Sequence, residues 1–390
     1  MENLRLSGGT LVTESQLIKA DLLIENGLIK EIIDESQVTQ GYKVIDCSNL
    51  YVSAGFIDIH QHGGGGADYM DGENDTYLKI TEAHLKHGTT SVMPTLLSAT
   101  KPALIKAVEG YLSAEKDDRI RANLLGLHLE GRYIAPSQAG AQKEDRISNF
   151  NSQEYSEIIE KANGRIKRWS VAPELLGAEE FANYANKNGI VLSIAHSDAD
   201  FDTTLKAFDL GFKHVTHFYS CTSSIVRKNG FRIAGIVEAT YYLDDMNVEI
   251  IADGCHLPHS LLKLIVKLKG VDNVSLITDA MRAAGENVTE SYLGSLEDPL
   301  PVVIEDGVAK LLDKKAFGGS IATSDRLVKT MLNAGVDLVS AVKMLTVNPL
   351  KQMNLNVKRG KIEKGYFADL CVFDKDVNVK KVIVNGKIAY

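Results

Sequence analysis

The sequence has no apolar run long enough to cross a membrane, and the segment after Met1 lacks the basic and apolar regions of a signal peptide. Its four cysteines, Cys47, Cys221, Cys255 and Cys371, are widely scattered and form no Cys-x-x-Cys pair. This spacing argues against a disulfide framework or a structural zinc knuckle, and it fits a reducing compartment. We therefore expect a cytoplasmic protein that does not associate with membranes.

The sequence also has no excess of positive charge. Its 43 Lys and Arg residues are outnumbered by 51 Asp and Glu residues, which gives a formal net charge of −8. That balance argues against a general nucleic-acid or anionic-membrane binder. The hydrophobic content of 44% and the charged content of 24% are ordinary for a soluble globular protein.

Both ends of the chain have a β-rich pattern. Near the N-terminus, residues 20–24 and 29–33 read as strands on either side of an Asn26-Gly27 turn signal. Near the C-terminus, residues 368–373 and 379–384 have the same character. We expect the two ends to pair into one small β-sandwich domain, formed by residues 1–54 and 356–390.

The middle of the chain, residues 55–355, alternates apolar strand-like runs with helix-like segments. The strand-like runs are residues 91–95, 124–130, 191–196, 214–217, 248–253 and 274–279, and the helix-like segments include 152–162, 178–188 and 260–268. This alternation indicates a parallel α/β architecture. Several runs end in His, Glu or Asp, as expected of a (β/α)8 TIM-like barrel with its site at the C-terminal face. A doubly wound sheet would gather its ligand at one switch point instead, so we favour the barrel.

A His-x-His pair ends the apolar run GFIDIHQHG at residues 55–63. In a β-strand, residues i and i+2 point to the same side, so His60 and His62 can present nitrogens to a common point. The glycines at 63–66 allow the following loop to approach a ligand closely. This pattern predicts a pair of metal ligands.

Four further polar residues follow strand-like runs: Glu130, His196, His217 and Asp279. Each one alone could be a solvated or hydrogen-bonded loop residue, and Asp279 could cap the next helix. Together with the His pair, they predict a metal site built from successive strand ends. The all-nitrogen-and-oxygen ligand set suits Zn²⁺, with Fe²⁺, Mn²⁺ or Co²⁺ as alternatives, and it is large enough for one or two divalent ions per subunit.

Taken in this order, the motifs resemble those of the amidohydrolase superfamily and, within it, the N-acetylglucosamine-6-phosphate deacetylase family. The matching stretches span nearly the whole chain and are residues 54–63, 126–131, 195–199, 215–217, 252–256, 276–281, 347–349 and 361–370. The resemblance implies a metal-dependent hydrolase that converts N-acetylglucosamine 6-phosphate and water to glucosamine 6-phosphate and acetate. The metal ligands that it implies are His60, His62, Glu130, His196, His217 and Asp279.

The resemblance also implies substrate contacts. Phe317, Gly318 and Gly319 match a substrate-contacting backbone turn, where glycines allow close approach. Arg227, in a basic loop, and His256 match phosphate-binding positions, in part across a dimer interface, so we expect a homodimer. The alternative for the basic loop is a solvated surface.

Two substrate-facing loops depart from the family pattern. Ala141 and Gln142 stand where the family has Ala-His, and a neutral Gln can donate a hydrogen bond but cannot carry positive charge. Ser220 and Cys221 stand where the family has Asn-Ala. Arg132 is an added cation, which either binds an anionic group of the substrate or pairs with a neighbouring acid.

We expect amide hydrolysis in which Asp279 moves the proton and Gln142 stabilises the developing oxyanion. No Gly-x-Ser-x-Gly motif indicates a seryl nucleophile. The rewritten loops leave a second possibility, a related amidohydrolase that acts on a different N-acyl sugar or a cyclic amide. A non-catalytic metal-binding barrel is the remaining alternative, and the presence of Asp279 argues against it.

Overall fold

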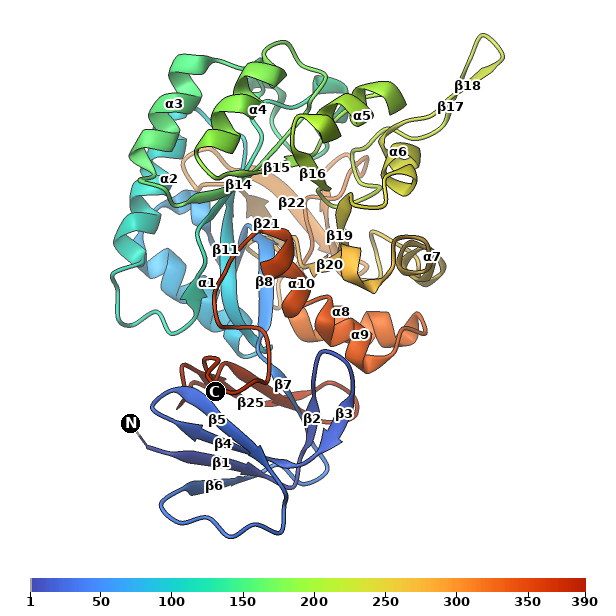
Figure 1. Ribbon diagram of the computed structural model, residues 1–390. Helices are drawn as coiled ribbons and strands as arrows, with labels where there is room; N and C mark the ends of the chain where they lie inside the picture. Colours follow the sequence, from blue (N-terminus) through green and yellow to red (C-terminus); the bar gives the residue numbers. More distant parts are fainter. Residues whose placement is uncertain (1) are drawn as a thin grey trace.

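The computed structural model describes residues 2–390, and most of these form a ring of eight parallel strands surrounded by helices (Figure 1). The barrel strands, in spatial order, are β8 (Phe56–Gln61), β11 (Thr89–Leu96), β13 (Leu127–Glu130), β14 (Ile166–Val171), β15 (Val191–Ile194), β16 (Phe212–Val215), β19 (Asn247–Ile251) and β20 (Val274–Ile277). A parallel bridge between Gln61 and Ala280 brings the last strand back to the first. The predicted (β/α)8 barrel is confirmed.

A helix follows each barrel strand. These helices are α1 (Asn74–Leu85), α2 (Lys101–Ala114), α3 (Ser152–Lys161), α4 (Ala178–Lys187), α5 (Phe201–Asp209), α6 (Ile236–Tyr242), α7 (His259–Lys269) and α8 (Ser324–Asn333), with α9 (Leu338–Lys343) and α10 (Val347–Gln352) after them. The three helices predicted from sequence are α3, α4 and α7. Helix α3 begins where predicted because the Asn151 side chain accepts a hydrogen bond from the Glu154 N–H. Within residues 2–390, no helix combines the length and apolar character that a membrane crossing requires.

Side chains alternate between the outside and the inside of the barrel. On β13, Leu127 and Leu129 belong to the main apolar core, whereas His128 makes polar contacts inside the ring. On β14, Trp169 packs in the same core, whereas Arg168 reaches across the interior. This period of two gives the barrel an apolar outer layer and a polar centre. Strand β14 escaped the sequence analysis because its inward Arg and Ser interrupt the apolar run.

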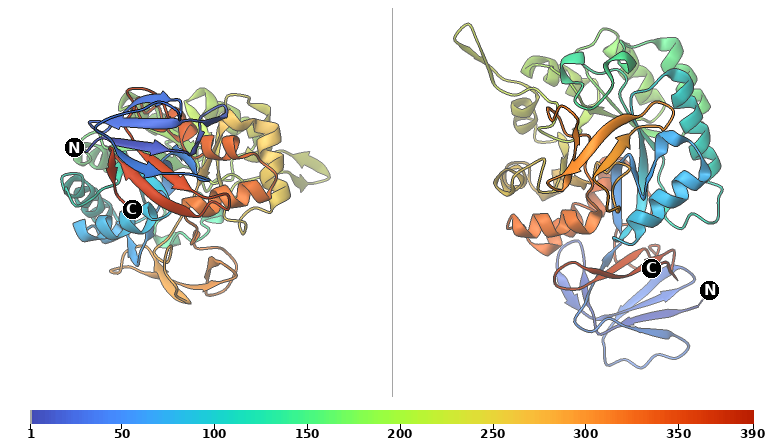
Figure 2. Two further views of the ribbon diagram at one scale, coloured as in Figure 1. Left: turned by 90° about the horizontal axis from the view of Figure 1, so that it is seen from below. Right: turned by 180° about the vertical axis from the view of Figure 1, so that it is seen from behind.

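The chain ends form two sheets below the barrel (Figure 2). One sheet has the order β5 (Leu28–Ile33), β4 (Asp21–Glu25), β1 (Leu4–Ser7), β6 (Lys43–Asp46), and the other has β26 (Lys387–Ile388), β25 (Val379–Val384), β24 (Leu370–Phe373), β7 (Tyr51–Ala54), β2 (Thr10–Val12), β3 (Leu17–Lys19). Apolar side chains of both sheets, such as Leu22 and Leu370, form one buried cluster. We propose the sequence-predicted domain boundaries, which lie between β7 and β8 and between α10 and β24.

Short strands interrupt the barrel pattern at several loops. A three-stranded sheet of β21 (Glu290–Leu293), β22 (Leu300–Glu305) and β23 (Val308–Leu311) separates β20 from α8, and a hairpin of β17 (Val226–Lys228) and β18 (Phe231–Ile233) projects away from the barrel (Figures 1 and 2). The shortest strands are β9 (Gly63–Gly64), β10 (Ala67–Asp68) and β12 (Asn123–Leu124). The sequence did not reveal these elements, because the exposed strands β17, β18 and β21 lack a continuous apolar run and β9, β10 and β12 are only two residues long.

Candidate metal centre

The six predicted metal ligands lie together at the carboxyl ends of the barrel strands. His60 lies within β8 and Glu130 is the last residue of β13. His62 follows β8 directly, and the other three each lie two residues beyond a strand: His196 after β15, His217 after β16 and Asp279 after β20. All six are buried. The strand order of the barrel therefore gathers residues that are far apart in the sequence.

Three of these residues have an unusual backbone conformation. The φ angles are 46° for His196, 26° for His217 and 48° for Asp279. Left-handed φ is uncommon outside glycine and costs on the order of 1–3 kcal/mol for each residue. These three strained residues lie at strand ends that face a single point, which is where a functional constraint would place them.

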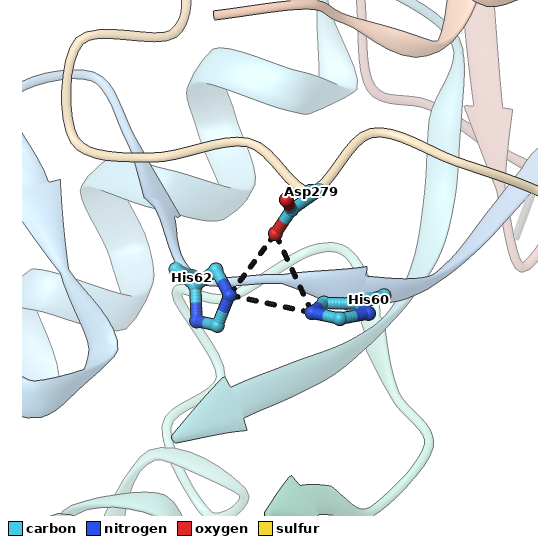
Figure 3. Close-up of side chains that lie close together, drawn as sticks. All are labelled: His60, His62 and Asp279. Atoms are coloured by element: carbon cyan, nitrogen blue, oxygen red, sulfur yellow. Dashed lines mark hydrogen bonds and ion pairs between the residues drawn. The ribbon is translucent and has the colours of Figure 1, made fainter. Parts of the chain in front are cut away.

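The first group of ligands consists of His60, His62 and Asp279 (Figure 3). The two Nε2 atoms of the histidines lie 3.3 Å apart. Asp279 Oδ1 lies 3.1 Å from His62 Nε2 and 3.4 Å from His60 Nε2. The second carboxylate oxygen of Asp279 points away from both imidazoles in Figure 3.

The second group consists of Glu130, His196 and His217. Glu130 Oε1 lies 3.3 Å from His196 Nε2 and 2.9 Å from His217 Nε2, and the two histidine nitrogens are 3.2 Å apart. Glu130 also joins the two groups, since its oxygens lie 3.5 Å from His60 Nε2 and 3.4 Å from His62 Nε2. A carboxylate in this position can bridge two ions.

These spacings fit metal coordination. Ligand atoms that bind a metal tetrahedrally at roughly 2.0–2.1 Å are about 3.3–3.4 Å from one another, because the distance between two corners of a tetrahedron is a fixed multiple of the distance from its centre to a corner. The ligand atoms within each group are separated by 2.9–3.4 Å. Each group can therefore surround one divalent ion.

The hydrogen bonds of the four histidines favour the same conclusion. The Nδ1 atoms face these oxygen acceptors: Glu249 Oε1 at 2.7 Å from His60, the Thr95 carbonyl at 3.3 Å from His62, the Gln138 carbonyl at 2.7 Å from His196, and the Ser220 carbonyl at 3.1 Å from His217. Carbonyl and carboxylate oxygens accept hydrogen bonds and do not donate them, so Nδ1 carries the proton. The Nε2 lone pair of each ring is then free to bind a metal.

The carboxylates make the cluster a favourable place for positive charge. Burial lowers the pKa of His60, but the Glu249 and Glu130 carboxylates outweigh it and raise that pKa to about 9. Burial has the same effect on His62, where Asp279 and Glu130 raise the pKa to about 10. A divalent cation can supply the positive charge that protons would otherwise bring.

Replacement of Glu130 by Gln is expected to lower the metal content strongly. Glu130 is the ligand that both groups share, and an amide oxygen lacks the negative charge that attracts the ions. Elemental analysis of protein purified without chelator should find at least about one transition-metal equivalent per wild-type chain, since sites with this ligand set bind tightly. A Glu130→Gln protein that retains the full metal content would contradict this assignment.

A buried ion pair between Arg168 and Glu249 supports one of the candidate metal ligands. The Arg168 guanidinium donates to Glu249 Oε2, and both side chains have no exposed surface. Glu249 Oε1 in turn accepts from His60 Nδ1 at 2.7 Å. Although burial alone would raise the pKa of Glu249, Arg168 and His60 hold it well below its usual range. The ion pair therefore fixes the orientation of one metal ligand.

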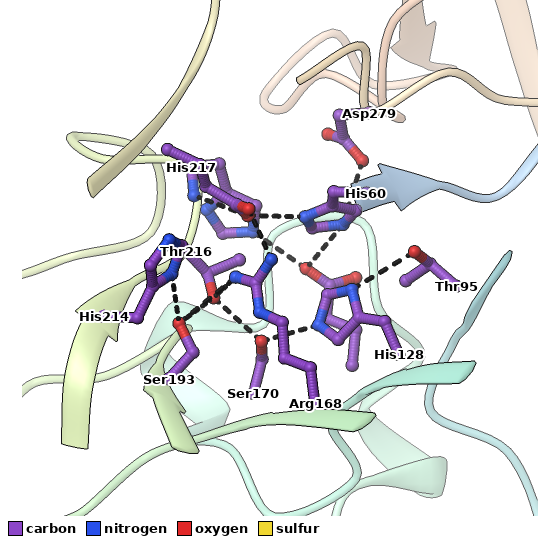
Figure 4. Close-up of polar contacts among 12 residues, drawn as sticks. His60, Thr95, His128, Arg168, Ser170, Ser193, His214, Thr216, His217 and Asp279 are labelled. Carbon is purple, nitrogen blue, oxygen red and sulfur yellow. Dashed lines mark hydrogen bonds and ion pairs between the residues drawn. The ribbon is translucent and has the colours of Figure 1, made fainter. Parts of the chain in front are cut away.

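The remaining inward side chains complete this network. Arg168 also donates to Thr216 Oγ1 at 2.7 Å and to Ser193 Oγ at 3.2 Å (Figure 4). His128 and His214 flank the guanidinium, and burial, followed by the charge of Arg168, lowers the pKa of both, to about 3 for His214. These two histidines are therefore neutral structural residues. The sequence pattern did not predict this network, and an alternation of polar residues along the strands was the only signal of it.

A cavity of about 220 Å³ opens above the ligands. The predicted site residues that line it are His62, Glu130, Ala141, Gln142, His196, His217, Ser220, Cys221, His256, Asp279, Phe317 and Gly319. His60 lies beneath, fully buried. Gly318 is beside the lining residues, where its N–H donates to the Ala309 carbonyl at 2.9 Å.

Arg227 is the predicted site residue that the structure does not bring to this cavity. It lies on β17 of the projecting hairpin and is exposed (Figure 1). Arg132 is also absent from the cavity lining, because it makes an ion pair with Glu154 at 3.2 Å and donates to the Ser148 hydroxyl at 3.1 Å. Of the two interpretations of Arg132, the structure supports pairing with a neighbouring acid.

Gln142 is positioned by contacts at both ends of its amide. Its Oε1 accepts from the Ser98 N–H at 2.9 Å, and its Nε2 donates to Glu130 Oε2 at 2.9 Å. Gln142 thus lies at the metal end of the cavity.

On another side of the cavity, Phe317 packs edge-on against His256 with ring centres 4.9 Å apart, and the Asp253 carboxylate accepts a hydrogen bond from His256 Nδ1 at 2.9 Å.

Comparisons with known proteins agree with this geometry. Residues 51–389 match the model of the amidohydrolase family. The chain is similar to N-acetylglucosamine-6-phosphate deacetylase of Lysinibacillus sphaericus, with 31% identity over 94% of this chain and 92% of the relative. A crystal structure of N-acetylglucosamine-6-phosphate deacetylase from Pasteurella multocida superposes with a TM-score of 0.91, at 26% identity and 99% coverage of both chains. A variant of the Mycobacterium smegmatis enzyme, solved in complex with N-acetyl-D-glucosamine-6-phosphate, superposes with a TM-score of 0.90 at 25% identity, covering 100% of this chain and 99% of that one.

Proposed function

Because this chain belongs to the amidohydrolase family and, within it, to the N-acetylglucosamine-6-phosphate deacetylases, we propose that it hydrolyses the N-acetyl group of N-acetylglucosamine 6-phosphate. The products are glucosamine 6-phosphate and acetate. The observation that carries the proposal is the pair of ligand groups joined by Glu130 at the base of a cavity.

Amidohydrolases depend on a divalent metal, and the two ligand groups can hold one ion each. We propose zinc, with iron, manganese or cobalt as the alternatives, because the ligands are imidazole and carboxylate without thiolate. A metal ion held there polarises a carbonyl oxygen and makes a neighbouring water more acidic.

The side chains around the cavity are proposed to transfer the proton, stabilise the oxyanion and bind the substrate. Asp279 is placed to accept a proton from the attacking water and to deliver it to the departing amine. Gln142 Nε2 is placed to donate a hydrogen bond near Glu130, where the oxyanion develops. The backbone at Phe317 and Gly319 provides a surface for the sugar, and His256 is placed to bind the phosphate.

Metal-loaded protein is expected to release acetate from N-acetylglucosamine 6-phosphate, and chelation should abolish that activity. The test is a panel of N-acetylated amino sugars with and without a 6-phosphate, assayed for acetate. Activity that survives complete metal removal would contradict the proposal. A preference for a different N-acyl sugar or a cyclic amide would favour the alternative that Gln142, Ser220 and Cys221 raise.

We also propose a homodimer in which the β17–β18 hairpin reaches the partner's cavity. The hairpin exposes Val226 and Phe231, which are 55% and 76% accessible, beside Arg227. Exposed apolar side chains on a projecting hairpin favour contact with another protein surface. In a symmetric dimer, the Arg227 guanidinium of each subunit would enter the cavity of the other subunit, near His256, where it can bind the substrate phosphate.

The Arg227→Ala variant is expected to raise KM for the phosphorylated substrate roughly tenfold to a hundredfold, the scale of a hydrogen bond to a charged group. Hydrolysis of N-acetylglucosamine, which has no phosphate, should change little. Lys228→Ala, on the same hairpin, is the matched control. Mixed dimers of Arg227→Ala and Asp279→Asn subunits should regain one intact cavity, so their activity at low substrate concentration should exceed that of either variant alone. An equal rise in KM for both substrates would contradict this arrangement. A protein that sediments as a monomer and is fully active would contradict it as well.

A cytoplasmic location is our proposal for the compartment. All four cysteines are free thiols, and Cys47 and Cys371 are buried. This arrangement supports a reducing environment.

A further inference from the structure

A second cavity lies behind one wall of the metal-site cavity. Its volume is about 320 Å³, roughly ten times the space that one water molecule occupies. The two cavities share four lining residues, Leu97, Ala141, Gln142 and Leu293. Three of these are apolar and belong to one cluster, which Leu300 of β22 also joins.

The shared wall lies at the acyl end of the proposed substrate. Gln142 lines both cavities and donates to Glu130, so the wall stands beside the scissile amide. His256, Phe317 and Gly319, which are proposed to face the phosphate and the sugar, line the first cavity and not the second. The acyl group is therefore the part of the substrate nearest to the second cavity.

The lining of the second cavity has an apolar part and a polar part, and the polar part includes Ser98, Thr100, Ser295 and Glu297. Its apolar surface comes from Met70, Ala103 and Leu300, in addition to the shared wall. Lys143 and Arg146 also line it, but both make ion pairs with Asp298, at 2.9 Å for Arg146. Glu297, the other lining carboxylate, pairs with Lys106. Because each of these charges has a partner, an uncharged chain can contact the apolar part of the lining.

We propose that the second cavity is an acyl-chain subsite, which lets this protein hydrolyse N-acyl amino-sugar phosphates with aliphatic acyl groups longer than acetyl. The inference rests on the deacetylase function proposed above. The reaction remains hydrolysis: the water oxygen bonds to the acyl carbon, the C–N bond breaks, and the amine nitrogen takes the proton that Asp279 carries. The added methylenes displace the side chains of Leu97 and Leu293 in the shared wall and enter the second cavity.

The test compares N-acetyl, N-propanoyl and N-butanoyl glucosamine 6-phosphate with the metal-loaded wild-type protein. Each added methylene is expected to lower KM by up to about fourfold, the scale of burying one CH2 group. Two variants fill the second cavity without touching the first, Ala103→Leu on α2 and Leu300→Trp on β22. Ala103→Ser is the matched control that leaves the cavity open.

The filled variants should lose at least about tenfold in kcat/KM for the N-butanoyl substrate, while their acetyl activity and that of Ala103→Ser stay near the wild-type value. A wild-type protein that cleaves the N-acetyl substrate but cleaves N-butanoyl more than about tenfold less efficiently would overturn the subsite alone. Equal N-butanoyl activity in the wild type and both folded, filled variants would overturn it as well. Hydrolysis of none of the three substrates would overturn the proposed function and the subsite together.

Discussion

Replacement of Asp279 by Asn is expected to lower kcat by about 10²–10⁴-fold, the usual scale for the loss of a general acid–base. Asp279 Oδ1 lies 3.1 Å from His62 Nε2, among the metal ligands, and the other oxygen points away from the histidines. Asparagine fills the same volume, but its amide cannot take up a proton near neutral pH. A plot of acetate release against pH should therefore lose the limb on which activity rises as the Asp279 carboxyl group loses its proton.

Metal content must be measured on the same Asp279→Asn protein, because we propose this residue as both a metal ligand and the proton carrier. A protein that keeps its metal but loses kcat would separate the two roles. Glu130→Gln is the comparison, since there the metal and the activity should fall together. Asp279→Asn protein with full metal content and wild-type kcat would show that another group moves the proton.

Replacement of Arg168 by Met is expected to lower the free energy of unfolding by about 3–5 kcal/mol, because it leaves the Glu249 carboxylate buried without its partner. Both side chains are fully buried, and the guanidinium also donates to Thr216 and Ser193. Trp169, the single tryptophan of the chain, is buried on the same strand and reports the loss of barrel structure by fluorescence in urea.

A second substitution tests the cause of that instability. Adding Glu249→Gln to Arg168→Met removes the uncompensated charge and keeps an oxygen that can accept from His60 Nδ1, so the double variant should recover part of the lost stability. The double variant should also bind metal about 10–100-fold more weakly than Arg168→Met, because a neutral amide oxygen is a weaker acceptor for His60 Nδ1 than a carboxylate oxygen. A double variant that is less stable than Arg168→Met would show that packing, and not charge, sets the cost.

The sequence by itself determined the barrel and predicted the residues of the candidate metal centre. Strand–helix alternation fixed the architecture, because parallel strands need a crossover of this length and the connecting helices carry a recognisable pattern. The ligands could be found because a His-x-His pair in a strand puts both rings on one side whatever the rest of the fold does. Glu130, His196, His217 and Asp279 could be added since parallel strands of a barrel end at one face.

Only the tertiary structure decided how those residues act. Left-handed φ angles at His196, His217 and Asp279 are set by the surrounding fold and leave no mark in the sequence. Arg168 and Glu249 form an ion pair although they are 81 positions apart in the sequence. Arg168 also lies on β14, a strand that the sequence pattern did not predict because polar residues interrupt its apolar run.

The same limit applies to the loops. Arg132 pairs with Glu154 rather than lining the cavity, and Arg227 stands on an exposed hairpin that projects away from the barrel (Figure 1). The second cavity arises where Leu97, Ala141 and Leu293, from three separate segments, pack side by side. A periodic pattern predicts which face of a strand or helix is buried, but loop contacts depend on long-range packing that sequence spacing does not encode.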